Sequence, residues 1–308
     1  KTTHLNEILL GQGALEKQYG KLIPLTSTCR DIYLASLAEP DTLQNSTGYA
    51  MELPMAIDEA LWQQAVIDVC SECDMLNASV INSKESYNEP AYFSIKARNE
   101  IPFAFYDFAV LNLPDDEIQQ KLKAAVVFPY DISSKDLYRQ TLIKVADNRY
   151  FITYAVHHIL SDGFACSLHI DYCLKRYEQL LEGNKQVMEI EDAFAEYSYK
   201  NLAAFDQQET LHYWQDNLAA VEGFSAEPSS TDEERLLELA VDDHHFNNIK
   251  QFCRQKAITP PLYFKAIFAL LVKQYQRSEH DFIFNESGAG RDKNNRLSIG
   301  CFYHNQPF

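Results

Sequence analysis

The sequence predicts a mixed α/β (α+β) protein with two lobes. Its length of 308 residues is enough for about two domains of typical size. Strand patterns and amphipathic helical patterns follow one another along the chain, which favours mixed sheets flanked by helices. We expect a polar lead-in over residues 1–21, a first lobe over 22–185 and part of a second lobe over 186–308, with an acidic, irregular stretch at 186–196 as the boundary.

Two-residue periodicity predicts the strands of the first lobe. Residues 46–53 alternate, with Tyr49, Met51 and Leu53 on one face. Asp58 follows as a helix N-cap, because its carboxylate can accept a hydrogen bond from the first turn. We expect strands at 46–53, 91–97, 103–110, 137–145 and 149–157, a turn at 147–148, and helices after Asp58, after Pro114 and over 163–181.

The second half is predicted to be mainly helical. Pro260 and Pro261 suit the first turn of a helix, where missing N–H groups cost nothing. We expect helices over 205–219, from about 244 and over 260–275, a polar loop at 227–234, and strands at 236–240 and 281–285, the last of them buried.

Charge and cysteine content exclude several kinds of partner. The net charge is −17, and an acidic surface repels both nucleic acid and anionic membrane surfaces. No apolar run approaches the roughly 20 residues of a membrane span, and the first residues lack a signal-peptide core. Seven cysteines without a disulfide framework favour a reducing, cytoplasmic location. Cys70 and Cys73 share the apolar face of a predicted helix, so we interpret them as core residues and expect no metal site.

One segment, Tyr154–Gly163, combines the residue types of a catalytic site. A predicted strand runs into His157 and His158, and after a short loop Asp162 precedes a helix that begins at Gly163. Strand alternation sends the two histidines to opposite faces. One can then support the strand while the other takes part in proton transfer. A carboxylate buried at the helix start requires a cationic or N–H partner.

The motif by itself is equally compatible with a turn that carries no chemistry, since Asp-Gly is common in turns. A second double histidine, His244-His245, follows Asp242-Asp243 at a predicted helix start and lacks the Asp-Gly. We interpret this second pair as capping and surface residues.

Together with further motifs in the same order, His157–Gly163 resembles the HHxxxDG motif of nonribosomal peptide synthetase condensation domains. These domains belong to a superfamily that resembles chloramphenicol acetyltransferase. The resemblance covers the chain from about Pro24 to Phe308. The other motifs are Pro24-Leu25-Thr26-Ser27 with Ile32-Tyr33, Pro129-Tyr130-Asp131-Ile132 with Leu137-Tyr138-Arg139, Tyr213-Trp214 with Leu218, and Gly290-Arg291 with Ile299-Gly300-Cys301-Phe302 and Pro307.

The resemblance implies two chloramphenicol acetyltransferase-like lobes in a V shape, with a tunnel between them. Upstream and downstream carrier protein domains deliver substrates tethered to phosphopantetheine, and an adenylation domain lies next to them in the synthetase. The amine of an aminoacyl acceptor attacks the donor acyl or peptidyl thioester, and an amide forms. The domain itself needs no metal and no bound cofactor.

The resemblance also implies roles for five residues. His158 is the catalytic histidine, either as a general base or by placing and stabilising the tetrahedral intermediate. Gly163 presents a backbone N–H to the reacting centre. His157 supports the strand, and Asp162 is a structural acid whose expected partner is Arg291.

The chain also departs from the family pattern. Cys29 and Tyr33 stand where glutamine and tryptophan are usual, and Tyr303-His304-Asn305 stands where valine-asparagine-threonine is usual, so His304 replaces a polar cleft residue. Arg139 is a rival partner for Asp162. The family's domain continues past its late motif, so we expect the second lobe to be incomplete here.

Several alternatives to amide formation remain open. A catalytically silent relative can serve as a docking platform, although such relatives generally lose the second histidine, which this chain keeps as His158. A free-standing acyltransferase and an ester-forming variant share the same motif. The intact histidine pair argues against the cyclising subfamily. Phe164-Ala165-Cys166-Ser167 lacks the serine-tryptophan that often follows in epimerising domains, which makes that activity less favoured.

Overall fold

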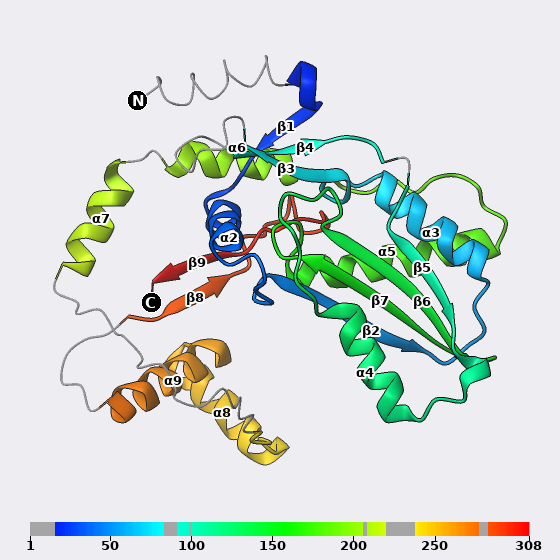
Figure 1. The fold of residues 1–308 in the computed structure, drawn as a ribbon. Coiled ribbons are helices and arrows are strands. Elements are labelled where there is room, and N and C mark those ends of the chain that lie inside the picture. Colours follow the sequence, from blue (N-terminus) through cyan, green and yellow to red (C-terminus); the bar gives the residue numbers. More distant parts are fainter. Residues whose placement is uncertain are drawn as a thin grey trace. The chain divides into compact units, whose positions relative to one another are not determined.

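The computed structural model divides into two compact units by its contacts (Figure 1). The first unit contains Lys1–Gln207 and Ser287–Asn305, and the second contains Gln208–Glu286 and Gln306–Phe308. The predicted lobes are defined by resemblance rather than by contacts, so their boundaries stay a prediction. The residues that the structure describes are 16–82, 91–98, 100–205, 208–219, 238–276 and 283–307.

A four-stranded mixed sheet lies at the centre of the first unit, which confirms the predicted α/β class (Figure 1). β7 pairs antiparallel with both β2 and β6, and β5 joins the far edge of β6 in parallel. β6 and β7 form a hairpin across the predicted turn at 147–148. The strands are β2 (Ser46–Leu53), β5 (Phe103–Asp107), β6 (Tyr138–Ala146) and β7 (Arg149–His157).

Helices cover both faces of this sheet because apolar side chains alternate along its strands. Ile152 and Tyr154 face the main core, where α3 and α5 contribute their apolar sides. Phe151 points to the opposite face and packs against α4. His157 lies six residues after Phe151 on β7, so strand alternation places it on the same face of the sheet as Phe151. The helices are α3 (Glu59–Ser71), capped by Asp58 as predicted, α4 (Asp115–Val126) and α5 (Gly163–Leu181).

A three-stranded antiparallel sheet, β1 (Lys21–Pro24), β4 (Ala91–Ile95) and β3 (Ala78–Asn82), completes the first unit together with α2 (Ser27–Ala38) and α6 (Phe194–Phe205). The sequence predicts an irregular stretch over 186–196, and residues 186–193 are irregular, but α6 begins at Phe194, so the prediction is wrong for the last three residues. Phe194 is fully buried against Phe93 and Phe302. Tertiary packing of this one side chain therefore fixes a helix start that the acidic local sequence hides.

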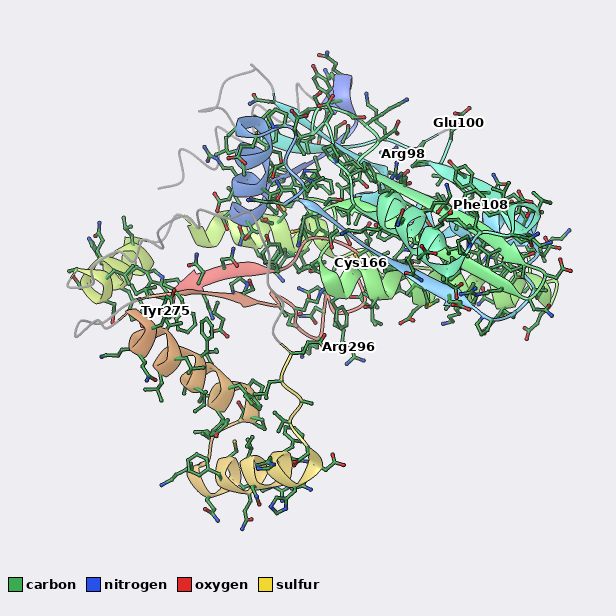
Figure 2. The ribbon with its side chains drawn as sticks, turned by 60° about the horizontal axis from the view of Figure 1, so that its bottom comes forward. Arg98, Glu100, Phe108, Cys166, Tyr275 and Arg296 are labelled. Carbon is green, nitrogen blue, oxygen red and sulfur yellow. The ribbon has the colours of Figure 1, made fainter. Side chains whose placement is uncertain are left out.

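The second unit contains the predicted helices α7 (Gln208–Leu218), α8 (Asp243–Lys256) and α9 (Pro260–Gln276). Asp242 caps α8, and both members of the His244-His245 pair are exposed, as predicted. Tyr275, near the end of α9, is 90% exposed (Figure 2).

The strands β8 (Asn285–Gly288) and β9 (His304–Pro307) pair with each other.

Two predicted strands differ from the structure. Residues 238–240, the described part of the first, form no strand, and Leu239 is 89% exposed. The second was expected as a buried strand over 281–285, but β8 begins only at Asn285, which is exposed. A run of apolar residues does not form a strand unless a neighbouring strand is present for it to pair with. The polar loop at 227–234 and most of the lead-in lie outside the described residues.

Cys70 and Cys73 are core residues, as predicted. All seven are free and buried, Cys70 and Cys73 among them. Figure 2 shows Cys166 within the first unit. Burial raises the pKa of the Cys70 thiol to about 12, so this side chain stays a neutral thiol. α3 and α5 are further joined by a buried ion pair, in which Arg176 Nε donates to Asp68 Oδ2 at 2.6 Å.

Acid is expected to destabilise the first unit through His169, a fully buried residue of α5. Its ring stacks on Tyr154, with ring centroids 4.0 Å apart. Burial lowers the pKa of His169 to about 3, whereas a histidine in an unfolded chain titrates near 6.5. Between these values the unfolded chain binds a proton that the folded chain does not. Stability therefore falls as pH falls through this window.

The variant His169→Phe keeps an aromatic ring and removes the titrating group, so its stability should depend less on pH. Urea midpoints measured between about pH 6.5 and 4 test this, with His212→Gln, a change of an exposed histidine, as the control. If the urea midpoint changed with pH by the same amount in the wild type and in His169→Phe, the expectation would be contradicted.

Candidate active site

The predicted catalytic motif lies where β7 passes into α5. β7 ends at His157, a turn follows over residues 158–160, and α5 begins at Gly163. The Leu160 N–H donates to the His157 carbonyl at 3.0 Å and closes the turn. Asp162 caps the helix, since its Oδ1 accepts from the Ala165 N–H at 2.7 Å. Local hydrogen bonds thus bring all four residues of the motif into one turn.

His157 is buried, and both of its ring nitrogens have partners. Nδ1 lies 3.1 Å from the Ile159 backbone nitrogen, and Nε2 lies 3.1 Å from Ser36 Oγ. The Tyr130 ring meets the imidazole edge-on, with centroids 5.8 Å apart. Burial, together with the neighbouring His158, lowers the pKa of His157 to about 4. The ring is therefore neutral near pH 7.

His158 is half-buried, and its ring has no hydrogen-bond partner among the described residues. Its backbone N–H donates to the Asn45 carbonyl at 2.7 Å. One face of the ring packs against Tyr303, with centroids 4.8 Å apart and planes 55° apart. The structure therefore fixes the backbone and one face of His158, while the imidazole makes no hydrogen bond to the described residues and its Nδ1 is buried.

Asp162 is 5% exposed and accepts hydrogen bonds from three residues. Besides the Ala165 N–H, its Oδ2 accepts from the Phe302 N–H at 2.9 Å. Arg291 Nη2 lies 2.9 Å from Oδ1 and 3.1 Å from Oδ2. A buried carboxylate is costly unless it is paired in this way.

Arg291 is itself enclosed, with its side chain 6% exposed. Its Nη1 donates to the carbonyls of Ser298, at 2.8 Å, and Asn295, at 3.2 Å. The guanidinium carbon lies 4.3 Å from the ring centroid of Phe302 and 4.9 Å from that of Phe164. Aromatic faces attract a guanidinium and restrict its motion. The arginine therefore presents one edge to Asp162 and holds its own loop with the other.

Glycine is required where the segment from 290 to 302 folds around this arginine. Gly290 has φ +61°, and a Cβ there would lie 1.7 Å from the Phe302 carbonyl oxygen. A Cβ on Gly300 would lie 2.5 Å from the Phe194 ring. These two positions explain the spacing of Gly290-Arg291 and Gly300 in the sequence.

Gly163 borders open space. No atom lies within 4 Å of the position that a Cβ would occupy. As the first residue of α5 its N–H has no acceptor within the helix, and a helix N-terminus carries partial positive charge. A ligand carbonyl can therefore approach this backbone N–H.

The structure separates the competing sequence interpretations. Arg139 does not reach Asp162. Its guanidinium carbon lies 3.4 Å from the ring centroid of Phe128, and its guanidinium donates to the carbonyls of Ala124 and Ala125. The rival pairing is therefore wrong.

Of the unusual residues in the late motif, Tyr303 rather than His304 contacts a histidine of the motif. The His304 ring packs on Gly288, where a Cβ would lie 2.7 Å from Nε2. Sequence reasoning missed Ser36 and Asn45, because a polar residue in a helix or loop carries no signal of its own.

The described part of the chain shows neither a metal-binding cluster nor a membrane-spanning helix. No cluster of three or more histidine, cysteine, aspartate or glutamate side chains there is arranged to bind a metal ion. Nor does that part contain a helix with the length and apolar character of a membrane span.

Comparison with known proteins gives the family. The family model described as "Condensation domain" matches residues 20–303. Bacitracin synthase 3 of Bacillus licheniformis is 22% identical over 278 residues, covering 88% of this chain and 4% of the synthase. A linear gramicidin synthase of Brevibacillus parabrevis is 23% identical over 328 residues, covering 95% of this chain and 4% of that protein. The chain thus spans a small part of the length of these relatives.

Solved structures share the fold. The first condensation domain of the calcium-dependent antibiotic synthetase, in complex with a substrate analogue, has a TM-score of 0.74 at 15% identity, covering 93% of this chain and 69% of that one. The X-domain in its complex with OxyB from teicoplanin biosynthesis has a TM-score of 0.75 at 16% identity, covering 93% and 65%. With the family model matching most of its length, the chain belongs to the condensation domain family.

Proposed function

We propose that the chain is the condensation domain of a nonribosomal peptide synthetase. It joins a carrier-bound donor acyl or peptidyl thioester to a carrier-bound aminoacyl acceptor through an amide bond. The names of its relatives, bacitracin synthase and linear gramicidin synthase, support an assignment to peptide assembly.

One observation carries this proposal. In the turn between β7 and α5 the polar side chains of His157 and Asp162 are fully engaged by hydrogen bonds, whereas the ring of His158 has none among the described residues. Four other buried atoms of the described residues also lack a partner, among them Arg291 Nε, but of the motif's two histidines and its aspartate His158 alone has such an atom, Nδ1. A ring held in place with its nitrogens uncommitted suits a group that acts on a substrate.

The chemistry follows from these positions. The acceptor amine attacks the carbonyl carbon of the donor thioester and forms a tetrahedral oxyanion. The C–S bond then breaks, the amide remains on the acceptor, and the donor thiol leaves with the proton that the amine loses. His158 takes up that proton or orients the amine and stabilises the intermediate. The Gly163 N–H, at the positive end of α5, donates to the oxyanion.

The remaining machinery supports this centre. Asp162 and Arg291 hold the turn against the segment from 290 to 302, and His157 supports the strand end. The donor and acceptor arrive on phosphopantetheine arms of upstream and downstream carrier domains, with an adenylation domain adjacent. The domain itself uses no metal or bound cofactor, and we assign it to the cytoplasm.

Docking without catalysis is the second candidate. One similar fold, the X-domain, is solved in complex with another protein, and a platform would need no catalytic histidine. The retained and uncommitted His158 favours transfer over docking. A free-standing acyltransferase or an ester-forming variant would use the same centre with a soluble thioester or a hydroxyl acceptor.

The variant His158→Ala should abolish peptide transfer without unfolding the chain. General acid–base groups typically contribute about 100-fold or more. Intact-mass analysis of the acceptor carrier, after reaction with loaded donor and acceptor carriers, measures the transfer. His244→Ala, which changes a histidine of the other double-histidine pair, is the matched control.

Transfer by His158→Ala within a few-fold of the wild type would contradict the assigned role. A wild-type chain that binds carriers but transfers nothing from any correctly loaded pair would favour the docking platform.

The acceptor chemistry can be tested separately. We expect product from an aminoacyl acceptor carrier and little from the matching hydroxyacyl carrier, because the amine is the stronger nucleophile. Mass analysis after mild base treatment distinguishes the products, since an ester is cleaved and an amide survives. Preferential formation of the base-labile product would identify an ester-forming domain instead.

A further inference from the structure

The hydrogen bonds of His157 select one of its two neutral tautomers. Its Nδ1 faces the Ile159 backbone N–H at 3.1 Å. A backbone N–H can only donate, so Nδ1 must accept and therefore carries no proton. The proton of the neutral ring then resides on Nε2 and points at Ser36 Oγ, 3.1 Å away. The ring is thus both a donor and an acceptor, in fixed directions.

Ser36 closes this arrangement from α2. Its hydroxyl donates to the Ile32 carbonyl at 2.8 Å, so its oxygen is left to accept. It accepts from His157 Nε2 and from Asn45 Nδ2, the latter at 2.8 Å. One donor and two acceptor sites are all that a serine hydroxyl has. Every hydrogen-bonding position of this hydroxyl is therefore occupied, and the residue is only 4% exposed.

Asn45 connects both histidines. Its side-chain amide donates to Ser36 Oγ, on the side of His157, while its backbone carbonyl accepts the His158 N–H at 2.7 Å. The end of β7 is therefore held on both sides of its last peptide bond, at the His157 ring by Ser36 of α2 and at the His158 N–H by Asn45 of the segment that joins α2 to β2. Displacement of Ser36 or Asn45 would move the peptide that carries the His158 ring.

We propose that Ser36 and Asn45 are positioning residues for the histidine pair. They hold His157 as the Nε2–H tautomer and fix the backbone of His158, so that the catalytic ring is set from α2 as well as from its own turn. The effect on the rate of peptide transfer rests on the proposed function. The tautomer of His157 and its dependence on Ser36 do not rest on that function.

The test uses the full chain labelled with ¹⁵N-histidine. Long-range ¹H–¹⁵N correlations report which nitrogen of His157 is protonated, with its signals assigned by their loss in His157→Gln. In the wild type we expect a proton on Nε2 that exchanges slowly with water. In Ser36→Ala that proton loses its acceptor and its signal, and in Ser36→Thr, which restores a hydroxyl, the signal returns.

The kinetic arm measures carrier-to-carrier transfer by the same proteins. Ser36→Ala should lower kcat about tenfold or more and leave KM nearly unchanged, because misplacement of a catalytic group acts on the reaction rather than on binding. Ser36→Thr should recover most of the rate. Ser198→Ala is the matched control. Ser198 is also a buried serine of a helix, and its hydroxyl donates to a backbone carbonyl, that of Pro24, rather than contacting either histidine.

Asn45→Ala provides a second variant should Ser36→Ala fail to fold, since it removes the amide donor and keeps the carbonyl that binds His158. We expect a smaller kcat loss from it, with the Nε2–H signal of His157 retained but exchanging faster.

Two outcomes overturn the proposal: a wild-type His157 protonated on Nδ1, or a folded Ser36→Ala with the kcat and the Nε2–H signal of the wild type. A wild type that transfers nothing, while its Nε2–H signal still depends on Ser36, overturns the proposed function and supports the positioning.

Discussion

The architecture of the site depends on one buried ion pair, between Asp162 and Arg291. The two residues are 129 positions apart in the sequence, and each is almost fully enclosed. Burying two charges is costly, and their attraction offsets that cost only when further hydrogen bonds satisfy the remaining groups. Asp162 meets this condition with two backbone N–H donors. Nη1 of Arg291 donates to carbonyls of its own loop, while its buried Nε has no partner among the described residues. The pair thus ties the start of α5 to the late Gly-Arg segment.

Around this pair, some polar side chains of the motif have hydrogen-bond partners and one does not. His157 is neutral because its environment offers an N–H to one nitrogen and a hydroxyl to the other, and burial lowers its pKa to about 4. Asp162 is occupied on both oxygens. His158 Nδ1 is one of five buried side-chain nitrogen and oxygen atoms that have no hydrogen-bond partner in the described part of the chain, and among His157, His158 and Asp162 it alone belongs to this group. Support from α2 and from the late segment allows a stable fold to keep such a group.

Local patterns predicted the parts of the structure that depend on local physics. Strand alternation and caps indicated β2, β7 and α5 with their observed bounds. The helix at Phe194 was missed because one buried ring, in contact with distant residues, fixes it. The pairing of Asp162 with Arg291 came from family resemblance rather than from any spacing rule. Ser36 and Asn45 could not be identified, since their partners meet only when α2 packs beside β7.

Native-state hydrogen exchange at the Phe302 amide, which donates to Asp162, tests most directly whether the ion pair holds the site together. In Arg291→Met an unbranched apolar side chain replaces the stem of the arginine beside the aromatic rings, and the charge and the hydrogen-bond donors are lost. Losing one partner of a buried pair costs roughly 3 kcal/mol, so the Phe302 amide should exchange about 100-fold faster. The Tyr154 amide, in the centre of β7, should change little. An unchanged Phe302 amide, or equal loss of protection at Tyr154, would contradict the account.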